Sequence, residues 1–385
     1  MKAFVFAVGL FAATSACTQP VVGAKSAIVM DAATGAILFE KNARATRYPA
    51  STTKVMTALL LIEHVKPGAM ITAPLDVKEV TGSSLHLRPG EQLTREDALY
   101  ALMLRSANDV AHTVAVHIGG SDIKFAALMN KRATELGCVN TRFRNPHGLN
   151  DDGHSTCAFD LVTIAREAMK NDVFRRTVRA PSWVVLRSIN QEDTLVQNTN
   201  KLLDFDPFIE GIKTGFTKPA GRCFVGAKSV DSWRLLSVVL NSPNWPKDTK
   251  SMFDWAFTEL QRSEPMHKGQ WVGNAPVRSG VSATMPSVLA QDFFVIFRRD
   301  HTGGRPTIEW VEARAPLQRG QVLGYVNATS FDGQRVRAAI VSTDDMPGAP
   351  PWQALAAIGA VCGSVVFGLR RRRRPRPRHR RQNAR

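Results

Sequence analysis

The stretch YPASTTKVMTALLLIE, residues 48–63, decides the fold of this 385-residue chain. After Thr53 it is apolar almost all round, which is typical of a helix buried in a core. Ser51 and Lys54 stand three positions apart at its start, so their side chains share a helix face with Cβ atoms about 5 to 6 Å apart. Burial lowers the pKa of a lysine, and a neutral lysine can take the proton of a serine hydroxyl that acts as a nucleophile. Free N–H groups at the start of the helix could then hold an oxyanion.

Two other short motifs could meet this pair. Ser106 and Asn108 lie in a joint between two helical patterns, from which side chains can project into a cleft. Lys213, Thr214 and Gly215 end a strand-like run, where glycine leaves room for another backbone and an extended peptide could present its terminal carboxylate. Each motif alone also has a structural interpretation: a serine cap with a solvated lysine, an asparagine cap, or a strand that leads into a turn.

The segments around the buried helix predict one antiparallel sheet with helices packed on it. Apolar runs at 27–31 and 36–40 predict a hairpin, and strand patterns return at 209–214, 222–230 and 234–240. Strands that come first and last in a unit suggest an antiparallel sheet built from both ends of a domain. Helical patterns are found at 94–104, where Thr94 with Asp97 three residues later resembles a capping box, and at 109–118, 123–136, 160–170 and 251–260.

The two ends of the chain predict export and a membrane anchor. Lys2, the uncharged run 3–13 and the small residues that follow it are typical of a secretory signal peptide cleaved after Ala24; cleavage after Ala16 would instead expose Cys17 for lipidation. An apolar run of transmembrane length precedes an arginine cluster that would stay in the cytoplasm, so the body of the protein is expected on the extracytoplasmic face. The expected parts are a signal peptide at 1–24, a catalytic domain at 25–262, a β-rich domain at 263–345, a linker at 346–351, a transmembrane helix at 352–369 and an Arg-rich tail at 370–385.

Composition excludes several classes of protein. With 44% hydrophobic and 22% charged residues, the chain is neither disordered nor a polytopic membrane protein. The net charge of +17 includes ten arginines in the tail, so the remaining +7 gives little reason to expect a nucleic-acid partner. The chain contains no C-x-x-C, H-E-x-x-H or G-x-S-x-G motif, which argues against a zinc site and an α/β-hydrolase. Cys138 and Cys157 could form a disulfide bond or remain buried free thiols.

Taken together, the three motifs point to a known family. S-T-T-K, S-A-N and K-T-G occur in the order of the S-x-x-K, S-D-N and K-T-G set of penicillin-binding proteins and class A β-lactamases. The chain strongly resembles the low-molecular-mass D-alanyl-D-alanine carboxypeptidases, serine peptidases of the penicillin-binding group, over about residues 25–260. The resemblance implies an α/β (α+β) transpeptidase-like fold, in which one antiparallel sheet has helices on both faces, followed by a small all-β domain and a transmembrane helix. The runs that carry the resemblance are YPASTTKVMTA at 48–58, LRSAND at 104–109, NPHGL at 145–149, GIKTGFT at 211–217 and, more loosely, APLQRGQVLG at 315–324.

The resemblance also implies roles for the first two motifs. Ser51 would be the nucleophile that forms an acyl-enzyme, and Lys54 its base. Ser106 and Asn108 would relay protons and orient the substrate. The substrate would be a peptidoglycan pentapeptide stem ending in D-Ala-D-Ala, β-lactams would inhibit the enzyme, and neither a metal nor an organic cofactor is implied.

For the third motif, the resemblance implies a carboxylate-binding strand. Lys213 and Thr214 would bind the carboxylate of the terminal D-alanine beside Gly215, and the N–H groups of Ser51 and Phe216 would hold the oxyanion. Phe216 stands where several relatives have histidine, which bears on substrate preference but leaves a backbone role intact. Thr199 stands where some relatives have a carboxylate-binding arginine, so the resemblance does not carry that contact over to this position.

Three alternatives share the same motifs. A class A β-lactamase uses a glutamate for deacylation, and Glu167 with Asn171 matches E-x-x-x-N, although Glu167 falls at a surface position of a helical pattern. A D,D-endopeptidase of the same fold would cut cross-linked peptides. A cell-wall-binding anchor with an inactive site is the non-enzyme alternative.

Overall fold

The computed structural model describes residues 19–299 and 305–350, which form two compact units divided between Glu259 and Leu260. The predicted transmembrane helix and tail lie outside the described residues, as do residues 1–18 of the predicted signal peptide. Within the two described ranges, no helix is long and apolar enough to cross a bilayer.

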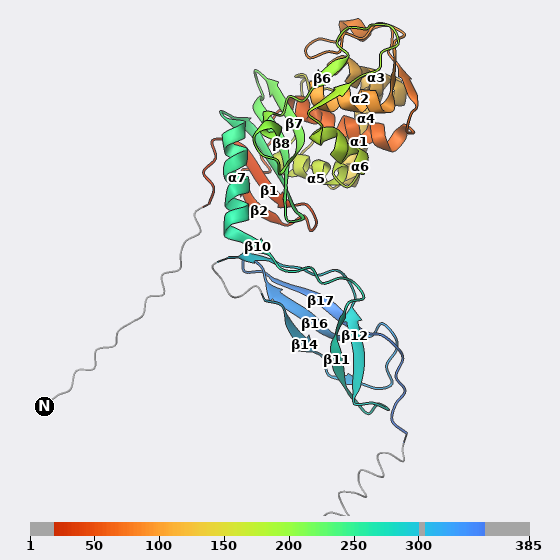
Figure 1. Ribbon diagram of the computed structural model, residues 1–385, viewed down its shortest axis with the longest axis vertical. Coiled ribbons are helices and arrows are strands. Elements are labelled where there is room, and N and C mark those ends of the chain that lie inside the picture. The colour runs from red at the N-terminus through yellow and green to blue at the C-terminus, as the bar shows by residue number, and fades with distance from the viewer. Residues whose placement is uncertain (1–18, 300–304, 351–385) are drawn as a thin grey trace, which may run out of the picture. The chain divides into compact units, whose positions relative to one another are not determined.

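The first unit contains a five-stranded antiparallel sheet that carries helices on both faces (Figure 1). Its strand order is β2-β1-β9-β8-β7, so the two ends of the unit meet in one sheet, as the sequence predicts. The strands are β1 (Ser26–Asp31), β2 (Ile37–Lys41), β7 (Ile209–Thr217), β8 (Gly221–Val230) and β9 (Trp233–Ser242). Strand β7 lies at the edge of the sheet, where its outer side is available to an extended peptide.

Most helices of the first unit lie on one side of this sheet, and α7 covers the other (Figure 1). The α-helices are α1 (Lys54–His64), α2 (Arg95–Tyr100), α3 (Asn108–Gly119), α4 (Asp122–Glu135), α5 (Ala158–Ala168), α6 (Asp172–Arg179) and α7 (Trp245–Glu259). Short helical turns are η1 (Ala50–Thr53), η2 (Val77–Glu79), η3 (Ala101–Arg105) and η4 (Lys201–Asp204), and two small ribbons pair β3 (Met70–Thr72) with β4 (Gln92–Thr94) and β5 (Ser182–Val184) with β6 (Leu195–Gln197).

The buried helix predicted at 51–63 is present with a different start. Residues 50–53 form the 3₁₀ turn η1, and the α-helix begins at Lys54. Its residues from Lys54 to Leu61 are all buried, which agrees with a sequence that is apolar all round.

The helix predicted at 94–104 is capped as expected but does not stay regular. The Thr94 hydroxyl accepts a hydrogen bond from the backbone N–H of Asp97 at 3.0 Å, and α2 begins there. After Tyr100 the chain widens into the π-helix η3 and ends at Ser106 in a left-handed conformation, with a φ of 65°. Such π segments are frequent at functional sites.

Two helices differ from the sequence-based expectation. Helix α6 has no counterpart among the predicted elements; it is short and is capped by the Asn171 side chain. Helix α7 begins at Trp245, six residues before the expected start, because Pro246 occupies its first turn, where a missing N–H costs nothing.

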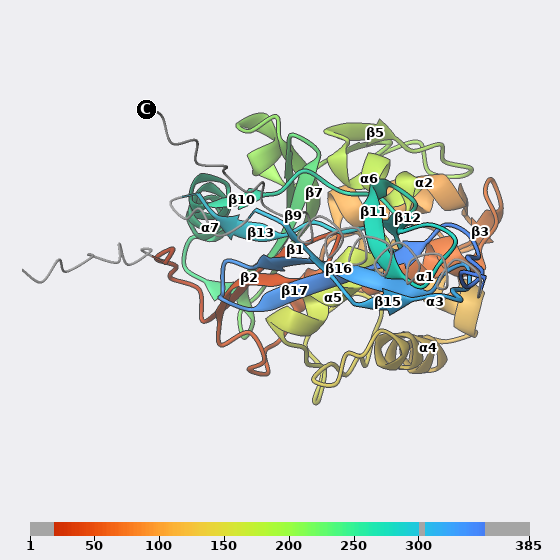
Figure 2. The same ribbon diagram turned by 90° about the horizontal axis from the view of Figure 1, so that it is seen from below.

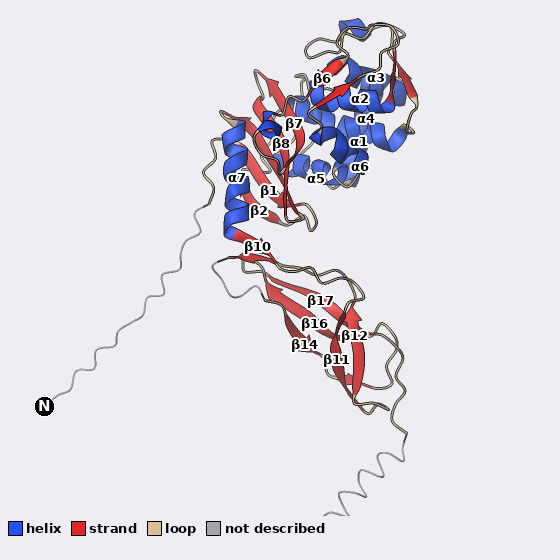
Figure 3. Cartoon of the chain, viewed as in Figure 1, coloured by secondary structure: helices blue, strands red, loops and turns tan. Residues whose placement is uncertain are grey.

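Within the described residues, the second unit contains strands and loops but no helix (Figure 3). A six-stranded sheet has the order β14-β16-β17-β12-β11-β15, and β10 pairs with β13. The long strands β16 and β17 run antiparallel side by side (Figure 2). The strands are β10 (Leu260–Arg262), β11 (Trp271–Arg278), β12 (Thr284–Leu289), β13 (Ile296–Arg298), β14 (Thr307–Trp310), β15 (Ala313–Arg314), β16 (Val322–Thr329) and β17 (Arg335–Ser342).

Candidate active site

Ser51 lies in η1, immediately before α1, on a backbone that is locally strained. The preceding residue, Ala50, has a φ of 49°, a left-handed conformation that residues with a Cβ rarely adopt. Such strain persists only where the surroundings hold it, and it concentrates at functional sites. The loop at Gly148 provides that support, since a Cβ there would come within 1.8 Å of the Ala50 carbonyl oxygen.

Lys54 is fully buried and surrounded by neutral oxygen atoms. Its Nζ donates to Ser51 Oγ at 3.2 Å, to Asn108 Oδ1 at 2.7 Å and to the backbone carbonyl of His147 at 2.8 Å. Within the described part of the chain, no carboxylate forms an ion pair with it. Burial, reinforced by the nearby charge of Lys213, holds the pKa of Lys54 well below its usual value. In the neutral form the two hydrogens of the amine serve Asn108 Oδ1 and the His147 carbonyl, and its lone pair can accept the Ser51 hydroxyl proton across 3.2 Å, which is the arrangement that a general base requires.

Asn108 begins α3 and connects Lys54 to the neighbouring loop. Its Oδ1 receives the bond from Lys54, while its Nδ2 donates to the Thr81 carbonyl at 2.7 Å. Its backbone N–H donates to the Ser83 carbonyl, also at 2.7 Å. The side-chain amide is thereby fixed with its oxygen toward the lysine.

Ser106 follows η3 in the left-handed conformation and is largely buried. No hydrogen bond from its hydroxyl to another described residue is present, so the hydroxyl is available to a substrate or water. The structure therefore joins Ser51, Lys54 and Asn108 directly and leaves Ser106 as an unengaged hydroxyl two residues from Asn108.

The K-T-G motif lies in the middle of the edge strand β7. Lys213 is buried, donates to the Thr214 carbonyl at 3.0 Å and, because of burial, has a pKa lowered to about 7. The Thr214 hydroxyl shares a 2.8 Å hydrogen bond with the hydroxyl of Thr199, the residue that stands where some relatives have an arginine. Two hydroxyl groups thus occupy the position expected to receive a carboxylate.

Gly215 brings β7 alongside the serine. A Cβ on Gly215 would lie 3.1 Å from the backbone nitrogen of Ser51 and 3.2 Å from Ala50 Cβ, closer than side chains normally allow. Glycine at this position lets the backbone of β7 pass this near to η1 without displacing a neighbouring atom. Phe216, the next residue, is exposed on the strand. The N–H groups of Ser51 and Phe216 consequently belong to segments that lie side by side.

One group at this site was not predicted from the sequence to contact the catalytic residues. The backbone carbonyl of His147 is a direct acceptor of Lys54, although the imidazole is not. The side chain of Asn145 holds this loop by accepting from the backbone N–H groups of His147 and Gly148. Burial lowers the pKa of His147 to about 3, so its ring stays neutral beside the lysine. The N-P-H-G run at 145–148 signals a turn, but a turn gives no indication of which carbonyl it presents.

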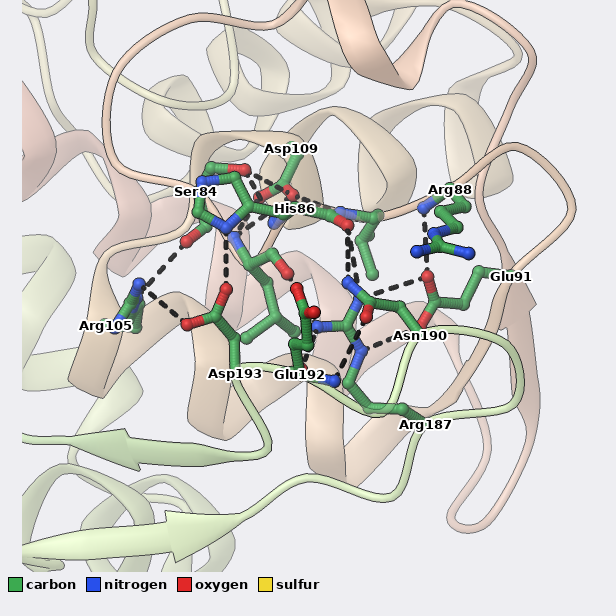
Figure 4. A network of polar contacts seen from close by, with 12 residues as sticks. Ser84, His86, Arg88, Glu91, Arg105, Asp109, Arg187, Asn190, Glu192 and Asp193 are labelled. Atoms are coloured by element: carbon green, nitrogen blue, oxygen red, sulfur yellow. Dashed lines mark hydrogen bonds and ion pairs between the residues drawn. The ribbon is translucent and has the colours of Figure 1, made fainter.

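A loop at residues 81–91 forms the wall beside Asn108, and a strap at residues 185–193 holds it in place (Figure 4). Asp109, next to Asn108, accepts hydrogen bonds from the backbone N–H groups of Leu85 and Leu87. Arg187 in the strap forms a bidentate ion pair with Glu91 at 2.7 and 3.0 Å, and neither side chain has any solvent exposure. Both ends of the loop are therefore tied down.

Two other sequence features have structural roles. Glu167 forms ion pairs with Arg132 at 3.2 Å and Lys170 at 2.6 Å, and Asn171 caps α6. These side chains are engaged in holding helices together. Cys138, Cys157 and Cys223 are buried free thiols, which decides between the two alternatives for the first pair. Within residues 19–299 and 305–350, no group of three His, Cys, Asp or Glu side chains could hold a metal ion.

The family model described as D-alanyl-D-alanine carboxypeptidase, Peptidase S11, matches residues 13–244. Among curated proteins, the D-alanyl-D-alanine carboxypeptidase DacF of Bacillus subtilis is 29% identical over 335 residues, which cover 84% of this chain and 86% of the relative. DacB2 of Mycobacterium tuberculosis is 33% identical over 242 residues, which cover 61% of this chain and 82% of the relative.

Solved structures show the same fold. Penicillin binding protein 5 from Haemophilus influenzae aligns with a TM-score of 0.73 at 24% identity and covers 86% of this chain and 99% of its own. The D-alanyl-D-alanine carboxypeptidase from Mycobacterium tuberculosis aligns with a TM-score of 0.59 at 30% identity and covers 63% of this chain and 94% of its own.

Proposed function

The chain belongs to the D-alanyl-D-alanine carboxypeptidase family Peptidase S11 and is a penicillin-binding, serine-type D-Ala-D-Ala carboxypeptidase, and we propose that it works through an acyl-enzyme on Ser51. The observation that carries this proposal is the contact between Lys54 Nζ and Ser51 Oγ at 3.2 Å. The amine is enclosed by neutral acceptors and has a lowered pKa, so it can remove the hydroxyl proton.

Acylation begins when Ser51 Oγ attacks the carbonyl carbon of the penultimate D-alanine and its proton passes to Lys54. The oxyanion forms against the N–H groups of Ser51 and Phe216, which lie on adjacent segments because Gly215 allows β7 to approach η1. The peptide bond breaks as the departing D-alanine amine receives a proton, relayed through the free hydroxyl of Ser106. Asn108 holds Lys54 in place and orients the peptide.

Recognition of the substrate relies on the edge strand β7. The peptide lies extended beside this edge and directs its terminal carboxylate to Lys213, Thr214 and Thr199. Deacylation follows when water attacks the ester and gives a proton to Lys54; as the ester bond breaks, Lys54 returns that proton to the Ser51 oxygen, which regenerates the hydroxyl and the neutral amine. The net reaction consumes one water and releases one D-alanine, and it removes the donor residue needed for cross-linking of the stem peptide.

The location of the enzyme completes the proposal. An exported catalytic domain at 25–262 and a β-rich domain at 263–345 would be held at the outer face of the cytoplasmic membrane by the apolar segment 352–369. The arginine cluster that follows this segment favours a cytoplasmic tail. Peptidoglycan stem peptides are accessible on that outer face.

A β-lactamase is disfavoured by the surroundings of Glu167. This carboxylate is engaged by Arg132 and Lys170, which lower its pKa and leave it a poor base for a deacylating water. Among the described residues, no carboxylate forms an ion pair with Lys54, and its pKa is lowered by burial. An inactive anchor is disfavoured because every motif residue is present.

The proposal is tested by intact-protein mass after treatment with penicillin, followed by peptide mapping, and by release of D-alanine from a pentapeptide. One acyl group is expected on the peptide that contains Ser51. Ser51→Ala should abolish labelling and turnover, while Ser121→Ala, which removes a serine at the N-cap of α4, should leave both unchanged. Labelling of Ser51→Ala, or acylation at another residue, would refute the mechanism.

A further inference from the structure

A cavity of about 550 Å³ is lined in part by Thr199, and Thr199 is the one residue of its lining that the mechanism above uses. Its walls come from the loop at residues 82–86, from Arg105 at the end of η3 and from the segment 195–201. These segments are distant in sequence. Because Arg105 immediately precedes Ser106, the cavity adjoins the catalytic groove.

The charged side chains that line this cavity are all basic. They are Arg105 and Lys201; the imidazole of His86 also lines the cavity, and no carboxylate does so within the described part of the chain. The acidic partners of the two cations are themselves partly exposed and lie at loose distances, 3.5 Å for Arg105 with Asp193 and 4.0 Å for Lys201 with Asp204. Contacts of that length leave N–H groups free to donate to an anion in the cavity.

The wall of the cavity is fixed before any ligand arrives. The Arg105 Nε donates to the Ser84 carbonyl at 3.2 Å, and His86 pairs with Asp193 at 2.7 Å (Figure 4). The same loop is held from behind by Asp109 and by the buried Arg187–Glu91 pair (Figure 4). A preformed site loses less conformational entropy on binding than one that must be ordered.

Thr199 joins the cavity to the carboxylate position on β7. Its hydroxyl shares a 2.8 Å hydrogen bond with that of Thr214, and Thr199 also lines the cavity. The α-carbon of the departing residue carries both its carboxylate and its side chain. With the carboxylate at these two threonines, the side chain of the departing residue starts next to Thr199, which lines the cavity together with Arg105 and Lys201.

We propose that this cavity is a specificity subsite for the side chain of the departing C-terminal residue, and that it favours D-amino acids with a side-chain carboxylate over neutral and basic ones. The inference rests on the proposed binding of the terminal carboxylate at Lys213 and Thr214. The reaction is unchanged: one water is consumed, the same peptide bond breaks, and D-glutamate leaves with a proton on its amine in place of D-alanine.

The test compares three peptides that end in D-Ala-D-Glu, D-Ala-D-Gln or D-Ala-D-Lys and are otherwise identical. D-Gln is the matched control, since it has the shape of D-Glu without the charge. We expect kcat/KM for D-Glu to exceed that for D-Gln by about fivefold and that for D-Lys by about tenfold or more at low ionic strength. The preference should shrink in 0.5 M salt, because the cations are partly exposed.

Substitutions then assign the preference to the cavity. Lys201→Gln should lower the D-Glu to D-Gln ratio at least twofold, and Lys201→Gln with Arg105→Gln should bring it close to one. Lys201 is exposed, so its loss does not threaten folding even if Arg105→Gln disturbs the loop. Lys247→Gln, an exposed lysine of α7 that does not line the cavity, should keep the wild-type ratio.

The outcomes separate this subsite from the proposed function. A wild-type ratio below two, or a ratio that the double substitution leaves unchanged, overturns the subsite. Hydrolysis of the D-Ala-D-Ala peptide is measured alongside. If that peptide is cleaved while the ratio is one, only the subsite fails; if it is not cleaved and Ser51 is not acylated, the proposed function itself fails.

Discussion

Two regions of the first unit each bury a cationic side chain, and they use it in opposite ways. At the floor of the groove, Lys54 is surrounded by a hydroxyl, an amide oxygen and a carbonyl, all neutral. In the loop and strap beside it, Arg187 faces the carboxylate of Glu91 and three backbone carbonyls. Both side chains are fully enclosed.

The difference lies in whether the buried group can lose its charge by giving up a proton. A lysine without a counterion can lose its proton, so burial lowers its pKa and produces a base. An arginine keeps its charge at any pH that a protein experiences, so burial requires a partner. The first arrangement provides reactivity, and the second ties two segments together.

The largest expected effect comes from Lys54→Met, which keeps the volume and removes the amine. Acylation by a fluorescent penicillin should slow by about a thousandfold or more, because the serine loses its base. The melting temperature should fall much less than in Arg187→Met, since no charge is left unpaired. Acylation within tenfold of wild type would show that another group is the base and would break the comparison.

Arg187→Met tests the other region. The substitution leaves the Glu91 carboxylate buried without a cation, and the free energy of unfolding should drop by about 3 to 5 kcal/mol in chemical denaturation. The rate of acylation by a fluorescent penicillin, per folded protein molecule, should fall by about tenfold, because the loop that anchors Asn108 loosens.

Two controls distinguish charge from packing in this result. Arg187→Met combined with Glu91→Leu should recover most of the lost stability, because the unpaired charge is gone. Arg132→Met, which removes the more exposed pairs with Glu63, Glu135 and Glu167, should cost about 1 kcal/mol or less and leave the acylation rate unchanged. If Arg132→Met proved as damaging as Arg187→Met, burial of the Arg187 pair would not be the cause.

Lys213 is a second buried lysine, and within the described residues it forms no ion pair with a carboxylate. Its expected role is to bind the substrate carboxylate, which requires the charged form. Its pKa of about 7 means that the ammonium group is present below that pH and is lost above it. The pH profile of kcat/KM should therefore fall on the alkaline side with an apparent pKa near 7, while the need for neutral Lys54 gives the acid limb. Lys213→Arg should move the alkaline limb up by more than one unit. An unchanged limb would assign it to another group.

His112 is intermediate between the buried lysines and Arg187. It is largely buried and can lose its proton, as a lysine can, but it also hydrogen-bonds to two carboxylates. Hydrogen bonds to Asp122 at 2.9 Å and Asp76 at 3.1 Å raise its pKa to about 9, although burial opposes the shift. Because the folded pKa exceeds the usual 6.5, this stabilisation is complete below pH 6.5 and is lost as the pH rises through 9. The difference in melting temperature between wild type and His112→Gln should be largest at pH 6 and small at pH 10. A difference independent of pH would indicate packing instead of charge.

Local patterns were sufficient for the elements that carry the motifs. The apolar run after Thr53, the Thr94 cap and the strand pattern of 222–230 depend on neighbouring residues, and each corresponds to an element of the structure. Helix α6 was missed because it is short and its pattern is weak. The conversion of the end of α2 to a π-helix was missed because nothing in the local spacing distinguishes it from a regular helix.

The functional site shows the same division between residues that the sequence predicts and residues that it does not. Sequence order supplied Ser51, Lys54 and Asn108, and the resemblance supplied their roles. The His147 carbonyl was not predicted, because it acts through its backbone, which any residue could provide. The Glu91–Arg187 pair was not predicted either, since neither residue belongs to a motif and 96 positions separate them.

The amino-acid sequence by itself determined the family, the order of the main-sheet strands and of most helices in the first unit, and the residues able to perform the chemistry, because periodicity and short motifs are properties of adjacent positions. The tertiary structure alone decided which oxygens surround Lys54, that Arg187 neutralises Glu91, and that Arg105 and Lys201 line one cavity. Those facts depend on contacts between distant segments. Their energies come from burial and charge, which exist only once the chain has folded and water has been excluded.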